Sequence, residues 1–368
     1  MAAAAVFAPV RQLGLIVIND EENISFKQEQ SPFYHVRDVA QMRRKLEGSS
    51  VIYLSSAPSA EVWQEAGKKK AMIHFEPDQR ALMQIIDLTN YKPRKRSALS
   101  FPLINRIQET LAENGKVVLF LNRRLLNENE IQKIGSENEA LAEYLRESGS
   151  RVQQLERDLA RLFPYAKAAR FDRDSDAVPK EANIIIATQA ILRVLDEIPV
   201  GLLAVLEIDA EMNRLDFRSA QRTFTLLMHL RQAAGKRILV QTFQMNNYCI
   251  RAAVKPDFAK FYRQELKYRR ELQLPPYRHL IEVACRGPQE EAVAGQAQAL
   301  FTHLKERLPA SAELMDPHHS PSGQWRGRVR VAIILKDKAV KPLIRHIKSA
   351  LKAVKRNKSV IITINVDP

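Results

Sequence analysis

The stretch LGLIVINDEEN at residues 13–23 decides the fold of the amino-terminal region, because an apolar run ends there in three consecutive acids. A second apolar run, in VIYLSSAPSAE at residues 51–61, ends in small and hydroxyl-bearing side chains. Short apolar runs separated by polar helical stretches predict parallel strands joined by helices. A carboxylate at such a strand end can hold Mg²⁺, and a second one can activate water. The two endings therefore indicate the acidic box and switch loop of a nucleotide-driven motor.

The same rhythm continues through the first region, which we place at residues 1–90. Further apolar runs at 71–75 and 85–88 predict strands, and the pattern at 34–46 predicts a helix. The segment YKPRKRSALS at residues 91–100 is basic, contains proline and lacks periodicity, which is typical of a linker.

A second α/β unit is predicted over residues 101–255. Between its first two strands, residues 125–148 hold six glutamates and predict a solvent-facing acidic helix. The other expected elements are a helix at 103–112 and buried strands at 116–121, 182–187, 202–208 and 236–242.

The last region, residues 256–368, has the clearest architecture. Its predicted order is strand, helix, two strands, helix and strand, which is the order of a ferredoxin-like split sheet. The second helix has a continuous apolar stripe with lysines and arginines elsewhere. The predicted strands are 279–286, 312–315, 328–335 and 359–366, and the predicted helices are 289–308 and 338–356.

The positive charge of the chain is concentrated at its carboxyl end. The 368 residues carry a net charge of +15, and residues 318–368 hold 12 lysines and arginines against 2 aspartates. A surface of this charge density favours a polyanion, and nucleic acid is the usual one. The alternative is a solvated basic face that serves solubility.

The two cysteines, Cys249 and Cys285, form no CxxC pair, so neither a disulfide framework nor a cysteine zinc site is expected. A reducing, cytoplasmic location fits this pattern. The opening residues lack a basic n-region, so a signal peptide is not expected. No apolar stretch has the length of a membrane span.

Three groups of motifs, spread over nearly the whole chain, carry a family resemblance. They are FAPVRQLGLIVINDEENISFKQEQ and LSSAPSAE near the amino end, KVVLFLNRR, RLFPYAKAARFDRD and DFRSAQRTF in the middle, and FYRQELKYRRELQLPPYRHL, RGRVRVAIILK and INVDP towards the carboxyl end. In these segments the chain resembles the primosomal protein N′ family, the PriA replication-restart helicases.

The resemblance implies the function of each region. It implies an α/β fold with a partial first helicase lobe at 1–90, a RecA-like parallel-sheet lobe at 101–255, and a ferredoxin-like α+β carboxyl-terminal domain at 256–368 that binds DNA and partners. It also implies that the chain begins inside the first lobe, without the family's amino-terminal DNA-binding region and phosphate-gripping Gly-Lys loop.

The acidic box departs from the family's Asp-Glu-Glu-His pattern. Aligned without gaps, Asn19 stands at the Mg²⁺-binding Asp, Glu21 at the second Glu and Glu22 at the His. Sliding by one residue keeps Asp20, Glu21 and Glu22 as a remnant box, but it turns alternate side chains to the other strand face. We favour the gapless register, and a solvated acidic loop is the favoured alternative to a metal site.

Three further positions of the family's motor are altered. Ala57 stands where the family has a coupling threonine, and Ala233 and Lys236 stand at the two arginines of the QxxGRxGR helix. In other nucleotide hydrolases, loss of an arginine finger costs roughly 10³–10⁵ in rate. Arg231 lies two residues from the finger position, and since a helix turns about 100° per residue, we expect it to point elsewhere.

No cofactor is expected. The family's cysteine-rich zinc module would follow LNRR, where this chain has the acidic segment without cysteine. His318 and His319 are predicted to be loop residues rather than metal ligands. ATP and Mg²⁺ are expected only if the chain is part of an active enzyme.

The predicted binding residues lie in two places. In the loop after the acidic box, aromatic and basic side chains can stack on bases and meet phosphates; the alternative is that Phe26 and Phe33 pack inside the lobe. In the carboxyl-terminal domain, cations are predicted to bind forked or single-stranded DNA or the acidic tail of single-stranded-DNA-binding protein; a solvated helix face is the alternative. The DNA-binding candidates are Phe26, Lys27, Phe33, Tyr34, Arg37, Arg326, Arg328, Arg330, Lys348 and Lys352, and the partner-binding candidates are Trp325, Lys341 and Arg345.

Two functional hypotheses follow from the sequence. The first is a non-catalytic DNA-binding protein of replication restart and primosome assembly, without ATPase or helicase activity of its own. The second is a fragment of an ATP-dependent 3′-5′ DNA helicase whose nucleotide-binding part is supplied upstream or in trans. A relic without function is a third option. The preferred DNA structure and the oligomeric state do not follow from the sequence.

Overall fold

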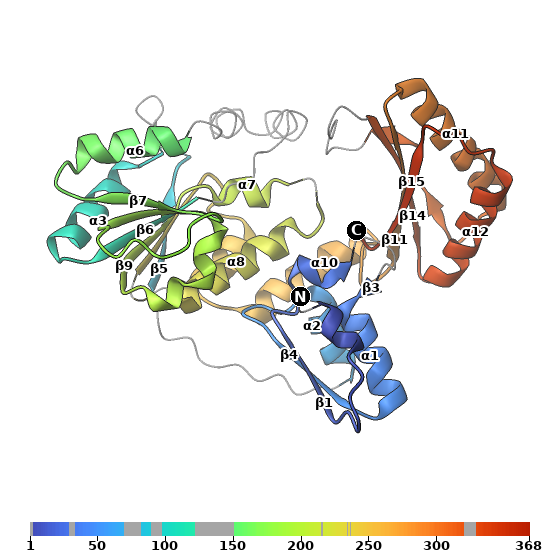
Figure 1. Ribbon diagram of the computed structural model, residues 1–368, viewed down its shortest axis with the longest axis horizontal. Helices are drawn as coiled ribbons and strands as arrows, with labels where there is room; N and C mark the ends of the chain where they lie inside the picture. Colours follow the sequence, from blue (N-terminus) through green and yellow to red (C-terminus); the bar gives the residue numbers. More distant parts are fainter. Residues whose placement is uncertain are drawn as a thin grey trace. The chain divides into compact units, whose positions relative to one another are not determined.

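The computed structural model of the chain describes residues 3–28, 34–69, 82–89, 98–121, 151–214, 216–233, 235, 237–319 and 329–368. Its contacts divide the chain into two compact units, whose elements are labelled in Figure 1. Unit 1 consists of Met1–Lys27, His35–Ser59 and Ala66–Gln264. Unit 2 consists of Gln28–Tyr34, Ala60–Glu65 and Glu265–Pro368.

The first sheet of unit 1 has two parallel strands, β1 (Leu15–Asn19) and β4 (Ser50–Leu54). α1 (Val36–Glu47) connects them; the His35 ring caps its start by accepting from the Arg37 amide, and Gly48 ends it with a φ of 71°. One face of the sheet, which we call the bare face, presents aliphatic side chains that are 45–50% exposed: Leu15, Val17, Ile52 and Leu54.

Shorter elements surround this sheet. Their bounds are η1 (Ala3–Phe7), η2 (Ile24–Phe26), the paired strands β2 (Lys27–Gln28) and β3 (Tyr34–His35), and α2 (Ala60–Lys69).

The second sheet of unit 1 has six strands in the order β5-β10-β9-β6-β8-β7, and every neighbouring pair is parallel. Its central strands are continuous apolar runs, which is what a sheet covered on both faces requires. The strands are β5 (Leu82–Asp87), β6 (Lys116–Phe120), β7 (Ala168–Phe171), β8 (Ile184–Ala187), β9 (Val200–Val205) and β10 (Arg237–Thr242).

Helices cover both faces of this sheet. α3 (Phe101–Ala112) begins at Ser100, whose hydroxyl accepts from the Leu103 amide, and it packs with α6 (Arg151–Leu162) over one face. Side chains of the other face, such as Phe120 and Val205, are fully buried as well. The remaining helices of this region are η4 (Gln189–Arg193), η5 (Leu195–Glu197), α7 (Ile208–Met212), α8 (Ser219–Ala233), α9 (Tyr248–Val254) and α10 (Phe258–Glu271).

Unit 2 contains an antiparallel sheet in the order β12-β14-β11-β15, with β13 also paired to β14. α11 and α12 pack on one face of it around a single apolar core (Figure 1). The elements are β11 (His279–Gly287), α11 (Glu290–Arg307), β12 (Glu313–Leu314), β13 (His318–His319), β14 (Val329–Asp337), α12 (Val340–Ala353) and β15 (Ile361–Val366).

The predicted fold class is confirmed: a RecA-like parallel sheet is followed by a ferredoxin-like split sheet. Two local predictions were wrong. The strand predicted at 85–88 was assigned to the first region, but it belongs to the six-stranded sheet of the second, because β5 pairs with β10 along its whole length. His318 and His319 form β13 rather than a loop. The strand predicted at 71–75, the linker up to residue 97 and the acidic helix at 125–148 lie outside the described residues.

Candidate functional site

Glu21, the middle acid of the box, is fully buried at the end of β1. Its Oε2 accepts from Arg37 Nη1 at 3.0 Å and from Ser59 Oγ at 3.1 Å, and its Oε1 accepts from the Ser59 amide. Arg37 also donates to the Ser59 hydroxyl. Burial of a carboxylate is costly unless it is paired and hydrogen-bonded, and both conditions are met. Glu21 therefore joins the end of β1 to α1 and to the residue before α2.

Glu22, its neighbour, is held differently. The Ser55 hydroxyl donates to Glu22 Oε2 at 2.5 Å. Burial raises the pKa of Glu22 from 4.5 to about 7, and the nearby Glu21 and Asp20 carboxylates raise it further, against the lowering effect of the Ser55 hydrogen bond. A carboxyl with this pKa is partly protonated at neutral pH, so it is a poor partner for a hard cation.

Asn19 and Asp20 complete the box. Asn19 is the last residue of β1, is exposed, and donates from Nδ2 to Asp20 Oδ2 at 3.3 Å. Asp20 has a φ of 51°, a left-handed conformation that aspartate tolerates better than most residues. The chain turns sharply there, so the acids do not converge. Among the described residues, no three His, Cys, Asp or Glu side chains could together hold a metal ion.

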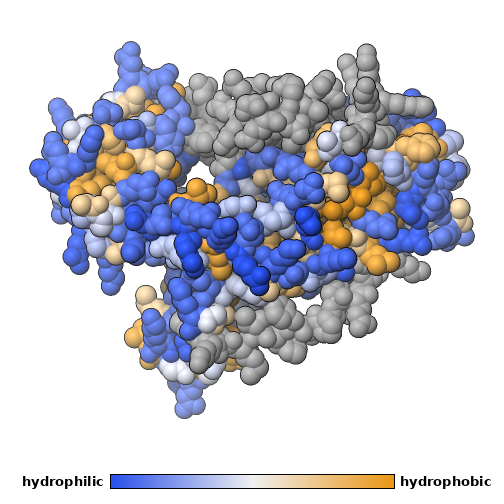
Figure 2. Space-filling model, turned by 180° about the vertical axis from the view of Figure 1, so that it is seen from behind, coloured by the Kyte–Doolittle hydropathy of each residue, from blue (hydrophilic) through white to orange (hydrophobic). Residues whose placement is uncertain are grey.

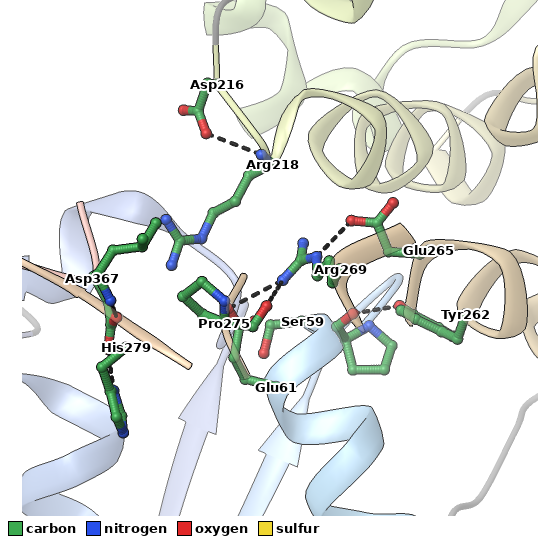
Figure 3. Close-up of polar contacts among 12 residues, drawn as sticks. Ser59, Glu61, Asp216, Arg218, Tyr262, Glu265, Arg269, Pro275, His279 and Asp367 are labelled. Carbon is green, nitrogen blue, oxygen red and sulfur yellow. Dashed lines mark hydrogen bonds and ion pairs between the residues drawn. The ribbon is translucent and has the colours of Figure 1, made fainter. Parts of the chain in front are cut away.

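The switch loop, residues 55–59, contacts α8 and α10. Ser56 Oγ donates to Gln232 Oε1 at 2.7 Å, and Thr225 Oγ1 donates to the Ala57 carbonyl at 3.3 Å. The Tyr262 hydroxyl donates to the Pro58 carbonyl (Figure 3). Tyr262 belongs to a buried aromatic cluster in which Phe224 stacks on Phe261 with ring centroids 4.0 Å apart. The switch loop and helix α8, which carry two of the altered motifs, are therefore in direct contact.

At the expected arginine-finger position the chain has Ala233, and the arginine nearby on α8 is Arg231. Arg231 is 8% exposed and donates from Nη1 to the carbonyls of Val254 at 3.2 Å and Ala253 at 3.5 Å, at the carboxyl end of α9. Its role is to cap α9, whose last carbonyls lack helical partners. Lys236 lies outside the described residues.

A cavity at the carboxyl ends of β5 and β10 was missed by the sequence analysis. Its volume is about 400 Å³. Behind it lies Asp209, fully buried, whose Oδ1 accepts from Thr242 Oγ1 at 2.6 Å and whose Oδ2 accepts from the Phe243 amide at 3.2 Å. Burial raises the pKa of Asp209 from 3.8 to about 7. The only sequence signal was a pair of acids, Glu207 and Asp209, at the end of the apolar run LLAVLEIDA. The lining residues are Asp87, Thr89, Phe243, Gln244, Met245, Asn246 and Asn247.

The predicted cations of α12 share one face of that helix. Lys341, Arg345, Lys348 and Lys352 are all exposed, at a spacing of four, three and four residues. Among the described residues, none of the four is in an ion pair or a hydrogen bond, and α12 contains no acid. Leu343, Ile347 and Ala350 occupy the opposite, buried face. We call the four cations the basic stripe.

Several other predicted DNA-binding residues are paired with acids or are half-buried. Arg330 donates to Glu282 Oε2 at 2.8 Å on the neighbouring strand, and Arg37 is paired with Glu21. Phe26, Lys27 and Tyr34 are half-buried. Phe33, Trp325, Arg326 and Arg328 lie outside the described residues.

The motifs of unit 2 that carried the resemblance are structural. Arg269, 1% exposed, donates from Nε to Glu265 at 2.7 Å and from Nη1 to Glu61 and the Pro275 carbonyl, both at 3.2 Å (Figure 3). In the closing INVDP, Asp367 accepts from the Leu280 amide at 2.8 Å and lies 2.8 Å from His279 Nδ1. Asp367 thus fixes the start of β11, and Arg269 joins α10 to Glu61 and to the segment that precedes β11.

The surface view in Figure 2 is mostly hydrophilic, with smaller hydrophobic groups between. Within the described part of the chain, no helix is both long and apolar enough to cross a membrane.

Together, the RecA-like parallel sheet and the antiparallel sheet of unit 2 define a helicase-like α/β fold. Residues 270–368 match the family described as the primosomal protein N C-terminal domain. The chain is 27% identical to the replication restart protein PriA of Bacillus subtilis, covering 100% of this chain and 53% of that protein. It is 28% identical to the PriA of Synechocystis, covering 99% of this chain and 52% of that protein. The chain is thus similar to PriA replication restart proteins over its whole length, which agrees with the predicted resemblance.

The chain spans about half the length of the curated relatives it matches. Among solved structures, it is similar to Saccharomyces cerevisiae Dbp5 bound to RNA and ADP BeF3, with 10% identity and a TM-score of 0.36 over 70% of this chain and 64% of that one. A de novo designed protein, Foldit4, is 17% identical with a TM-score of 0.21, over 24% of this chain and 94% of that one.

Proposed function

We propose that this chain is a PriA-like DNA-binding protein of replication restart that binds forked or single-stranded DNA and has no ATPase or helicase activity of its own. The observation that carries the proposal is the basic stripe. Four exposed cations on one helix face, unpaired within the described residues, suit the phosphates of a nucleic-acid strand.

The stripe supports backbone binding rather than base recognition. Lysine and arginine side chains on an exposed face meet phosphates as mobile charges, and each phosphate contact releases a condensed counterion. Affinity through the stripe should therefore fall steeply with salt and depend little on sequence. The same stripe suits the acidic tail of single-stranded-DNA-binding protein or other primosome proteins, because both present closely spaced negative charges.

The absence of hydrolysis is proposed from the state of the motor residues. Glu21 uses its oxygens on Arg37 and Ser59, and Glu22 has a raised pKa. Asn19 cannot supply the charge that Mg²⁺ requires from its few protein ligands. Arg231 caps α9 instead of facing a phosphate. Each of these alterations affects a different step, so restoring one would not restore the cycle.

A second candidate function is a helicase part whose nucleotide-binding region is supplied upstream or in trans. The bare face of the β1–β4 sheet favours it, because parallel sheets are normally covered on both faces. A further polypeptide layer over Leu15, Val17, Ile52 and Leu54 would complete such a sheet. The altered residues on α8 weigh against this candidate, since an added layer leaves them unchanged.

Fork-DNA binding at two salt concentrations tests the proposal. We expect binding at 50 mM salt that weakens by about 100-fold at 200 mM, as four phosphate contacts would produce. Binding that is insensitive to salt, or no binding at 50 mM, would overturn it. The second candidate predicts in addition that ATP hydrolysis appears once the missing region is present.

A further inference from the structure

The cavity at the carboxyl ends of β5 and β10 lies where open parallel sheets commonly bind ligands. β5 and β10 pair from Leu82 opposite Arg237 to Asp87 opposite Thr242, so both strands end at the same level. The loops that leave these ends, through Thr89 and through residues 243–247, form the walls of the cavity. All of these residues belong to unit 1.

The walls are held in place by an internal network. The Leu88 amide donates to the Thr242 carbonyl at 2.9 Å, and Thr89 Oγ1 donates to the Phe243 carbonyl at 3.2 Å. The Gln244 amide donates to Thr242 Oγ1 at 2.9 Å, and that hydroxyl donates to buried Asp209. This network explains a carboxylate in the middle of an apolar core: Asp209 fixes the backbone at Phe243. The cavity is therefore preorganised, which lowers the cost of binding.

The lining chemistry selects the ligand class. Among the described residues, the walls offer one carboxylate, one hydroxyl, three amides, an aromatic ring and a thioether, and no lysine or arginine. The Asp87 carboxylate would repel a phosphate at these described walls, so an anion is disfavoured. A flat, neutral, hydrogen-bonding ring fits better, because Phe243 and Met245 supply apolar faces and the amides pair with its edge.

We propose that this cavity binds a nucleobase of a single-stranded nucleic acid, with a preference for guanine. Guanine carries two adjacent N–H donors on one edge, and a carboxylate can accept both. Asp87 Oδ1 accepts from the Thr89 amide at 2.9 Å, and Oδ2 has no partner among the described residues. A carboxylate has about four acceptor positions, so Oδ1 can accept a second bond. Gln244 and Asn246, which line the same cavity, supply amides for the remaining edge.

This inference adds base recognition to the proposed DNA binding. It rests on that proposed function when the guanine is part of a DNA strand. The two roles differ in kind: the basic stripe meets phosphates, whereas the cavity distinguishes bases. A single favoured base would give the strand a register on the protein.

The test uses the ε-methyl signal of Met245 in methyl-labelled full-length chain, assigned through Met245→Leu. Guanosine is titrated against adenosine, cytidine and thymidine, and binding of a thymidine oligonucleotide with one central guanine is compared with the all-thymidine strand. We expect guanosine alone to shift the signal, and the single guanine to improve binding by about fivefold to tenfold.

Asp87→Asn should abolish both effects and leave the salt dependence of DNA binding unchanged. Asp196→Asn is the matched control, since it removes an exposed carboxylate in η5, before the amino end of β9. DNA binding without a guanosine shift or guanine preference would overturn the cavity proposal alone. A guanosine shift without DNA binding would overturn the proposed function and leave the cavity proposal standing. Equal shifts with all four nucleosides would overturn the guanine preference.

Discussion

The arginines of the motor remnant and the cations of α12 have opposite environments. Arg37 and Arg231 are largely buried. The Arg37 guanidinium pairs with the Glu21 carboxylate, and the Arg231 guanidinium donates to a carbonyl at the end of α9. The four cations of the basic stripe are exposed and, within the described residues, unpaired. The difference teaches that the arginines near the acidic box and on α8 hold the fold, whereas the cations of α12 lie exposed on unit 2.

The largest expected effect comes from reversing the stripe. Glutamate at Lys341, Arg345, Lys348 and Lys352 together should weaken fork-DNA binding by about a thousandfold and lower the salt slope by about 3 to 4, because four phosphate contacts are lost. Fluorescence anisotropy over a salt series measures both. The matched control reverses four exposed cations of unit 1: Arg173, Lys180, Lys255 and Lys260. Equal losses in both variants would show that net charge, not the stripe, binds DNA.

The next effect is on stability. Glu21→Gln leaves the Arg37 guanidinium without its carboxylate in a largely buried place, and we expect a loss of about 2–4 kcal/mol in the free energy of unfolding. Asp20→Asn, one residue away and half-exposed, should cost less than about 0.5 kcal/mol. Chemical denaturation of both variants gives the comparison. Similar small costs at both positions would mean that Glu21 is not a structural residue.

A smaller loss is expected at α8. Arg231→Ala removes the cap of α9 and leaves two carbonyls unpaired, at a cost of about 1–3 kcal/mol. Arg251→Ala, on the exposed face of α9, should cost less than about 0.5 kcal/mol. The thermal midpoints of the two variants distinguish a structural role of Arg231 from a role in nucleotide chemistry. If Arg231 served only nucleotide chemistry, Arg231→Ala would unfold at the same temperature as the wild type.

The smallest effect concerns pH. The folded pKa of Glu22 is raised to about 7, above its ordinary 4.5, so folding favours the protonated form. The stability this provides is fully present below pH 4.5 and is lost as pH rises through about 7. Glu22→Gln should therefore gain about 1–2 kcal/mol relative to wild type between pH 5 and pH 8. Unfolding curves at both pH values measure this difference, and Glu113→Gln, at an exposed helix end, should show none. A gain at low pH would contradict the assignment.

The sequence predicted the strands well where apolar residues either alternate regularly or form one continuous run. The alternating Val329, Val331, Ile333 and Leu335 predicted a strand with one core face, and these residues enter the core of unit 2 as expected. The apolar runs of the second lobe likewise became its central strands. β7 was missed because AARF is short and carries a charge in the middle.

Partners of polar side chains could not be predicted. The Arg37–Glu21 pair joins residues 16 positions apart, and Arg330–Glu282 joins two strands separated by a helix. Such contacts depend on the three-dimensional packing and leave no periodic signal. The cavity was missed for the same reason, since Asp87 and Met245 become neighbours only when β5 pairs with β10.

ATP hydrolysis and fork-DNA binding, measured on one sample of the purified chain at 50 mM salt, test the central claim most directly. The account predicts that DNA binds and that phosphate release, with or without the fork, stays at the level of a protein-free blank. DNA-stimulated phosphate release above that blank, which falls away in Asp20→Asn, would contradict it.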